Sequence, residues 1–171
     1  MTLAIILSVL GTVSICIPPL LKGKNMKWIL LLVFSANALT GVSYALTMAF
    51  NGAASCCVGA AQTIINYFFD RKNKPIPIWL IAIYAVAFLV VNLFVFSKLA
   101  DILALLAALA GVLAVCQKNG KRFRQCMFMN ATLWIIYDAI TFSFGPLCTH
   151  ALQLGTNLFG IIMHDRKKNE E

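Results

Sequence analysis

Charged residues are scarce in this sequence. Lysine, arginine, aspartate and glutamate make up 12% of the 171 residues, whereas hydrophobic residues make up 61%. A water-soluble protein needs more charge than this to cover its core, so the composition excludes an ordinary soluble domain and predicts an integral membrane protein. Since each membrane-spanning helix takes about 20 residues, seven such helices would use nearly the whole chain and leave no room for a separate soluble domain.

The patterns that mark enzymes and metal proteins are also missing. No serine and histidine are placed as a nucleophile and its base, carboxylates are too few for paired acid–base chemistry, and no glycine-rich phosphate loop occurs, so we expect neither an enzyme nor a cofactor. The six cysteines lack CxxC and Cys/His spacing, and we interpret them as small packing residues. His150 and His164 lie near the two ends of the last apolar stretch without spaced partner ligands, so we expect no metal.

Nucleic acid is a further partner that the sequence does not favour. The net charge is +8, but no basic helix face and no aromatic stacking platform accompany it. The basic residues instead form short clusters between apolar stretches, which is the pattern of membrane proteins.

Seven apolar stretches account for most of the chain. They cover residues 3–21, 28–50, 53–69, 76–96, 99–116, 123–144 and 146–163. The first has no lysine or arginine before it and three lysines soon after it, which is the reverse of the charge order in a cleavable signal peptide. We therefore predict an all-α, polytopic membrane protein with seven transmembrane helices.

The basic residues alternate between the loops. Thirteen of the fourteen follow the first, third, fifth and last stretches, and only Lys98 lies on the other side. The thirteen are Lys22, Lys24, Lys27, Arg71, Lys72, Lys74, Lys118, Lys121, Arg122, Arg124, Arg166, Lys167 and Lys168. Because cytoplasmic loops carry the excess of lysine and arginine, this bias predicts an N-terminus outside the cell and a cytoplasmic C-terminus.

Two parts of the chain share a pattern of polar residues. An Asn-Ala pair is followed seven residues later by tyrosine in the second and sixth stretches, and a Gln-x3-Asn pattern occurs in the third and seventh. We therefore predict two three-helix repeats, residues 1–74 and 99–171, joined by a linker helix within 75–98. Since the linker crosses the membrane once, the repeats should have parallel orientation in a three-plus-one-plus-three arrangement.

Three short segments carry a resemblance to a known family. They are Gly52-Ala-Ala-Ser55, Trp134-Ile-Ile-Tyr-Asp138 and Gly155-Thr-Asn157, and with the spacing between them the chain resembles the YgjV-type bacterial inner membrane proteins over nearly its whole length. The resemblance implies a multi-pass protein of the bacterial cytoplasmic (inner) membrane.

The predicted architecture is also similar to that of the SWEET (PQ-loop) sugar transporters and the nicotinamide riboside transporters, which have three plus one plus three helices. The chain departs from the SWEET pattern because it has no Pro-Gln pair and no proline inside the second, fifth or sixth stretch. Pro18-Pro19, near the end of the first stretch, is the remaining candidate for a hinge.

Polar side chains near the middle of a membrane are expensive and are therefore candidates for function. Eight of them fall within about two helical turns of the predicted midplane: Asn37, Gln62, Asn66, Asn130, Trp134, Asp138, Gln153 and Asn157. Amides donate and accept hydrogen bonds, which suits a neutral solute rich in hydroxyl or amide groups, and Trp134 offers a stacking surface. The resemblance to SWEET transporters implies that Asn66 and Asn157 contact the substrate. The alternative is that these amides hold the helices together.

Asp138 is the only ionisable residue that the predicted stretches place well inside the membrane, and no basic residue is expected to pair with it. Such a carboxylate must be protonated, partnered or exposed to water. One interpretation is a proton-coupling carboxylate. The other is a structural aspartate bonded to Tyr137, Thr141 or an amide.

These features favour transport or facilitated diffusion of a small polar neutral solute, sugar-like or vitamin-like, between the two helix triplets. The alternative is a non-transporting scaffold or partner-binding protein of the inner membrane. The expected partners are the lipid bilayer and the solute, and homo-oligomerisation is left open. A polar cavity between the triplets would favour transport, whereas closed apolar packing would favour the alternative.

Overall fold

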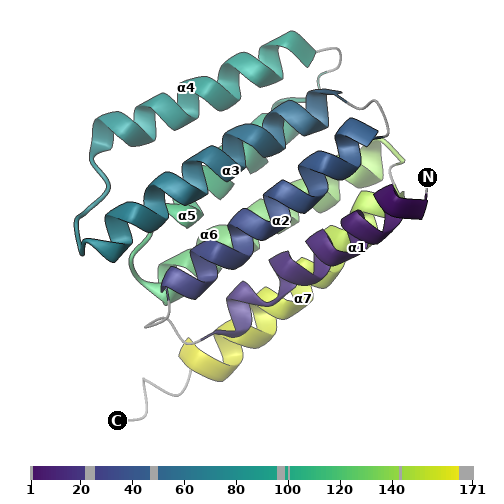
Figure 1. Ribbon diagram of the computed structural model, residues 1–171. Helices are drawn as coiled ribbons and strands as arrows, with labels where there is room; N and C mark the ends of the chain where they lie inside the picture. The colour runs from purple at the N-terminus through teal and green to yellow at the C-terminus, as the bar shows by residue number, and fades with distance from the viewer. Residues whose placement is uncertain are drawn as a thin grey trace.

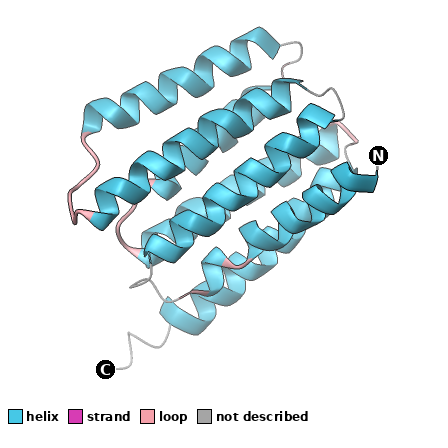
Figure 2. Ribbon diagram, viewed as in Figure 1, coloured by secondary structure: helices cyan, strands magenta, loops and turns pink. Residues whose placement is uncertain are grey.

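The computed structural model describes residues 2–21, 26–46, 50–95, 99, 101–142 and 144–165. These residues form seven α-helices and one short 3-10 helix, and no strand occurs among them (Figure 2). The prediction of an all-α chain with seven helices is confirmed. Of the basic residues counted in the loops, Lys22, Lys24, Lys98 and those at 166–168 lie outside the described residues.

The helix bounds follow the predicted stretches to within a few residues. The helices are α1 (Thr2–Cys16), α2 (Met26–Leu46), α3 (Phe50–Arg71), α4 (Ile78–Val95), α5 (Asp101–Val115), α6 (Gly120–Ile140) and α7 (Phe144–Asp165), with the 3-10 helix η1 (Pro18–Leu20) after α1. By length and composition alone, the segments Thr2–Leu20 and Met26–Leu46 could cross a membrane, and Ile78–Phe94 and Asp101–Val115 are shorter apolar helices.

Two helix ends differ from the prediction for local reasons. The first stretch is not one continuous α-helix, because Pro18 and Pro19 lack the amide hydrogens that an α-helix needs, and the chain continues as η1. Helix α6 begins at Gly120 rather than Phe123, since the Asn119 side chain accepts a hydrogen bond of 2.9 Å from the Lys121 amide and caps the first turn. With this start Arg124, counted above among the basic residues between the stretches, lies in the second turn of α6.

The helices form two layers (Figure 1). Helices α1 to α4 lie in one layer and α5 to α7 in the other, and each helix packs against the next along the chain. Helix α7 also contacts α1, so the two layers meet at this edge as well as through α4 and α5. The start of α1 and the end of α7 lie at opposite ends of the bundle, which we call the amino end and the carboxyl end (Figure 1).

Apolar side chains fill the space between the layers. One cluster joins α2 to α5 and α6 through Ile29, Val33, Val115 and Phe123, and a second joins α4 to α5. Helix α5 buries Ala104, Ala107, Ala110 and Ala114, and these small residues allow close helix packing. Many large apolar side chains on the outer helix faces are exposed, including Leu3, Val9, Ile83, Phe94 and Phe159.

Candidate functional site

The amides of α3 bond to neighbouring helices. Gln62 and Asn66 are both buried, and their side-chain nitrogens donate to the backbone oxygens of Val112 at 3.2 Å and Val115 at 3.0 Å. The Tyr84 hydroxyl of α4 donates to Asn66 Oδ1 at 3.1 Å. These bonds join α3, α4 and α5, which is what interhelical hydrogen bonds do in a membrane bundle.

The two asparagines of the Asn-Ala pairs are placed differently. Asn37 Nδ2 donates to the Val33 oxygen of its own helix at 3.1 Å, and its side chain lies against Gly59, where a Cβ atom would meet Asn37 Oδ1 at 2.9 Å. Asn130 Nδ2 donates to the Ala107 oxygen of α5 at 2.7 Å. Asn130 therefore connects two helices, whereas Asn37 needs the glycine of α3 to fit.

The amides of α7 include an unsatisfied acceptor. Gln153 Nε2 lies 3.4 Å from Asn130 Oδ1, and Asn157 Nδ2 donates to the Gln153 backbone oxygen at 2.7 Å. Asn157 is completely buried, and its Oδ1 is the one buried side-chain polar atom without a hydrogen-bond partner in the described part of the chain. An acceptor left this way costs about 1–3 kcal/mol. Asn157 is therefore the predicted site residue with an unused interaction.

The two Gln-x3-Asn pairs do not bond to each other. The side chains of Gln62 and Asn66 bond to α4 and α5, whereas those of Gln153 and Asn157 bond to α6 and to α7 itself. Their hydrogen bonds therefore do not join the four amides across a central pathway. A groove on the surface of α4 is lined by Val90, Leu93 and Phe94, and none of the predicted site residues belongs to its lining.

Asp138 lies near the amino end of the bundle and has a basic partner. Its Oδ2 is 2.7 Å from His150 Nδ1 of α7. The Asp138 side chain is 3% exposed and the His150 side chain is 19% exposed. The expectation that Asp138 lacks a basic partner is wrong, because the short connection between α6 and α7 brings together two residues twelve positions apart.

Aromatic residues surround this pair. The Trp134 ring stacks on the His150 imidazole, with ring centroids 5.3 Å apart and planes at 9°. Tyr137 packs edge-on against Trp134 and donates its hydroxyl to Asp101 Oδ1 at 3.3 Å. The predicted stacking surface of Trp134 is thus occupied on one face by His150.

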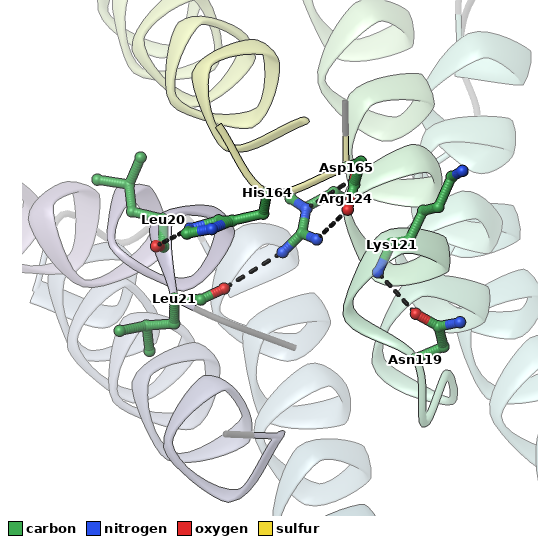
Figure 3. Close-up of polar contacts among 7 residues, drawn as sticks. All are labelled: Leu20, Leu21, Asn119, Lys121, Arg124, His164 and Asp165. Atoms are coloured by element: carbon green, nitrogen blue, oxygen red, sulfur yellow. Dashed lines mark hydrogen bonds and ion pairs between the residues drawn. The ribbon is translucent and has the colours of Figure 1, made fainter. Parts of the chain in front are cut away.

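A second buried ion pair lies at the carboxyl end (Figure 3). The Arg124 guanidinium of α6 contacts the Asp165 carboxylate of α7 through Nε at 3.1 Å and Nη2 at 2.5 Å. The two side chains are 3% and 9% exposed. Arg124 Nη1 also donates to the Leu21 backbone oxygen at 3.2 Å. Asp138 is therefore not the only buried ionisable residue in the helices.

The carboxyl-end pair also holds the chain after the double proline. His164 Nε2 lies 2.7 Å from the Leu20 oxygen, so the carbonyls of Leu20 and Leu21 meet a side chain from α7 and one from α6 (Figure 3). The carbonyls at a helix end lack partners within the helix, and these side chains supply them. Gly160 of α7 lies so close to the Pro19 oxygen that a Cβ atom would collide with it. The glycine therefore permits η1 to pack on α7.

Sequence reasoning missed His150, Arg124 and Asp165 as members of buried pairs. The contact of His150 could have been predicted. Asp138 lies in the last turn of α6 and His150 in the second turn of α7, so a tight hairpin between the helices places the two side chains at the same height in the bundle. Arg124 was counted among the loop residues that orient the protein, and its pairing depends on where α7 ends in space. No pattern within the sequence predicts that contact.

Comparison with known proteins supplies the family. The model of the Imp-YgjV family, described as a bacterial inner membrane protein, matches residues 3–168. No curated protein and no solved structure matches the chain, so the similarity to SWEET transporters stays a prediction. The match covers nearly all of the described helices. The chain therefore belongs to the Imp-YgjV family of bacterial inner membrane proteins and resides in the bacterial inner membrane.

Proposed function

We propose that the protein carries a small polar neutral solute across the inner membrane. The observation that carries this proposal is the unpaired, fully buried Oδ1 of Asn157. An acceptor that no protein group satisfies is a position at which a hydroxyl or amide hydrogen of a solute would gain a bond that the empty protein lacks. Gln153 and Asn130 lie beside it and extend the polar surface.

We propose further that the carboxyl end of the bundle faces the cytoplasm. All lysines and arginines that the structure describes lie in the loops or helix ends at this end: Lys27, Arg71, Lys72, Lys74, Lys118, Lys121, Arg122 and Arg124. This distribution supports a cytoplasmic C-terminus and an external N-terminus, because positive residues are retained on the cytoplasmic side.

The solute would pass between two three-helix units, α1 to α3 and α5 to α7, which correspond to the repeats 1–74 and 99–171 with α4 as linker. Such a repeat is supported by the shared order of packing: α2 packs against both α1 and α3, and α6 packs against both α5 and α7. The break at Pro18 and Pro19 is the point at which α1 could bend during alternating access.

A non-transporting scaffold is the second candidate, and a separate observation favours it. Gln62, Asn66 and Asn130 each donate to a backbone oxygen of α5, so these amides already have the role of interhelical bonds. In a scaffold, Asn157 would be satisfied by a bound water molecule. The two candidates therefore differ in whether the Asn157 carbonyl meets a transported solute.

Paired leucine substitutions of Asn157 and Asn66 separate these functions. Asn157→Leu removes both an unsatisfied acceptor and the Nδ2 bond to the Gln153 oxygen of the same helix, so the two effects should offset and the free energy of unfolding should change by less than about 1 kcal/mol. Asn66→Leu removes the bonds to Val115 and Tyr84 and should destabilise the protein by about 1–3 kcal/mol. Both variants would be purified beside the unsubstituted protein, and their thermal unfolding recorded.

Transport is measured on the same proteins in liposomes. The unsubstituted protein is first screened for thermal stabilisation by a panel of neutral sugars, nucleosides and vitamins, and uptake of each stabilising compound is then followed with a radiolabel. We expect Asn157→Leu to lose uptake while it stays folded. Unchanged uptake in that variant would contradict the proposed contact, and a panel without any stabilising or transported compound would favour the scaffold.

A further inference from the structure

The Asp138–His150 pair has the chemistry of a proton-binding site. When the Asp138 carboxylate is ionised it can only accept hydrogen bonds, so in that state the contact of 2.7 Å places a proton on His150 Nδ1. In the neutral imidazole this leaves the lone pair on Nε2. His150 Nε2 has no hydrogen-bond partner among the residues that the structure describes, and about one fifth of the His150 side chain is exposed.

Proton uptake at Nε2 changes the charge of the pair in a defined way. A proton from water forms an N–H bond at Nε2 and gives an imidazolium that still donates Nδ1–H to Asp138. The pair then passes from a net charge of −1 to zero, and loss of the same proton to water restores −1. Because a net charge is expensive in a low-dielectric interior, a conformation that buries the pair favours the protonated form and one that exposes it favours release.

We propose that His150 and Asp138 form a proton site that is coupled to the conformation of the bundle, in which His150 carries the proton and Asp138 provides the opposite charge. This inference rests on the proposed transport function and names its coupling ion. A change in burial between two states of the protein would make proton binding and conformational change depend on each other, because each state binds the proton with a different affinity.

The side chains that approach the pair from the other helices are not imidazoles. Asp101 of α5 accepts the hydroxyl hydrogen of Tyr137, and Tyr44 of α2 interacts electrostatically with Asp138 and with Cys56 of α3. Helix α1 contributes Thr12, which lies 3.4 Å from Thr149 of α7. Imidazole is the only one of these side-chain types that ordinarily changes charge between about pH 5 and 8. No lysine or arginine of the described chain lies at this end.

Two properties of the sequence make a direct measurement simple. The chain has two histidines, so His164→Gln leaves His150 as a single imidazole that can be labelled with nitrogen-15. It has three tryptophans, and Trp28 and Trp79 are 64% and 60% exposed, so Trp28→Phe and Trp79→Phe leave Trp134 as a single fluorophore stacked on His150. The probe in both cases is the proton itself, and no solute is needed.

The first measurement follows both signals from about pH 5 to about pH 8 in lipid nanodiscs. We expect the His150 nitrogen resonances and the Trp134 fluorescence to change together, because a protonated imidazole quenches an indole stacked on it. His150→Gln should abolish the fluorescence change, and Asp138→Asn should move its midpoint. Constant resonances and constant fluorescence across this range would overturn the proton site.

The second measurement tests coupling. Hydrogen–deuterium exchange at the Leu20 and Leu21 amides, which donate to Ile17 and Pro18 at the opposite end of the bundle, is compared at the two pH limits, with rates corrected for intrinsic exchange. We expect the protection factors to depend on pH in the unsubstituted protein and to lose this dependence in His150→Gln. Titration without any change in protection would overturn the coupling. If Asp138→Asn elutes as an aggregate, His150→Gln alone decides both measurements.

The outcome is independent of the solute test. A titrating, coupled pair with no transported compound would leave the proton site intact and contradict the transport function. Transport that depends on Asn157 in a protein whose His150 does not titrate would support the transport function and contradict the proton site.

Discussion

The two ends of the bundle each contain a largely buried acid–base pair between α6 and α7, but the pairs differ in chemistry. At the carboxyl end Arg124 forms two contacts with Asp165 and one with the Leu21 oxygen. At the amino end Asp138 meets His150 through one contact, and an aromatic ring covers the imidazole. A guanidinium keeps its charge at any physiological pH, whereas an imidazole changes charge near neutrality.

This difference assigns separate roles to the two ends. The Arg124–Asp165 pair is a permanent clamp, since it cannot be released by proton loss and it holds the segment that follows the double proline. The Asp138–His150 pair can change its net charge with a single proton. The carboxyl end of the α6–α7 hairpin is therefore held by a permanent ion pair, whereas the pair at the amino end can change its charge.

The orientation of the two ends gives the largest expected effect, because labelling is all or none. In a variant without native cysteines, Ser97→Cys and Lys121→Cys are each treated in intact cells with a maleimide that does not cross membranes. We expect labelling of Ser97→Cys and none of Lys121→Cys, since the basic carboxyl end should be cytoplasmic. Labelling of Lys121→Cys before cell lysis would reverse the orientation and assign the clamp to the external side.

Removal of one partner from the clamp should give the largest effect on stability. Arg124→Met leaves the Asp165 carboxylate without its partner, and such a loss from a buried pair costs about 3–5 kcal/mol. The measurement is the free energy of unfolding in detergent. The double variant Arg124→Met with Asp165→Leu is the control, since it removes both charges and should recover much of the loss. Equal stability of the single variant and the unsubstituted protein would show that the pair is not a clamp.

Substitution of Asp138 should lower the free energy of unfolding less than substitution of Arg124 does, and the loss should depend on the new side chain. Asp138→Asn keeps an oxygen that can accept the His150 Nδ1 hydrogen, whereas Asp138→Leu leaves that donor unsatisfied. We expect Asp138→Leu to lower the free energy of unfolding by about 1–3 kcal/mol and Asp138→Asn by less. Thermal unfolding at neutral pH gives both values. A larger loss in Asp138→Asn than in Asp138→Leu would contradict the hydrogen bond.

The smallest effect is expected for the second histidine. Among the residues that the structure describes, His164 bonds to the Leu20 oxygen beside the clamp. Glutamine can donate in its place, so His164→Gln should change the free energy of unfolding by less than about 1 kcal/mol. It should also leave the pH response at His150 unchanged. Loss of that response in His164→Gln would place the proton site at the carboxyl end and contradict the comparison of the two ends.

Much of the architecture could be predicted because it depends on local chemistry. The seven apolar stretches correspond to seven helices, since a run of about 20 apolar residues is the length that crosses a bilayer. The first helix was predicted too long, although Pro18 and Pro19 mark its end in the sequence. The amides were also recognised as buried, but their spacing could not distinguish Asn66, which is doubly bonded, from Asn157, which has an unused acceptor.

The sequence by itself determined that this chain is helical, that it belongs in a bacterial inner membrane, and that Asp138 and the amides are its uncommon polar residues. The helices and the uncommon polar residues follow from composition and from spacing along one helix, which the linear order contains, whereas the bacterial inner membrane follows from the resemblance to the family. Only the tertiary structure decided that His150 is the partner of Asp138 and that Arg124 clamps Asp165 and the segment after the double proline. It also decided that Asn157 Oδ1 has no partner within the described part of the chain. Each of these depends on which face of one helix meets which face of another, and many side-chain contacts across the bundle together decide that geometry.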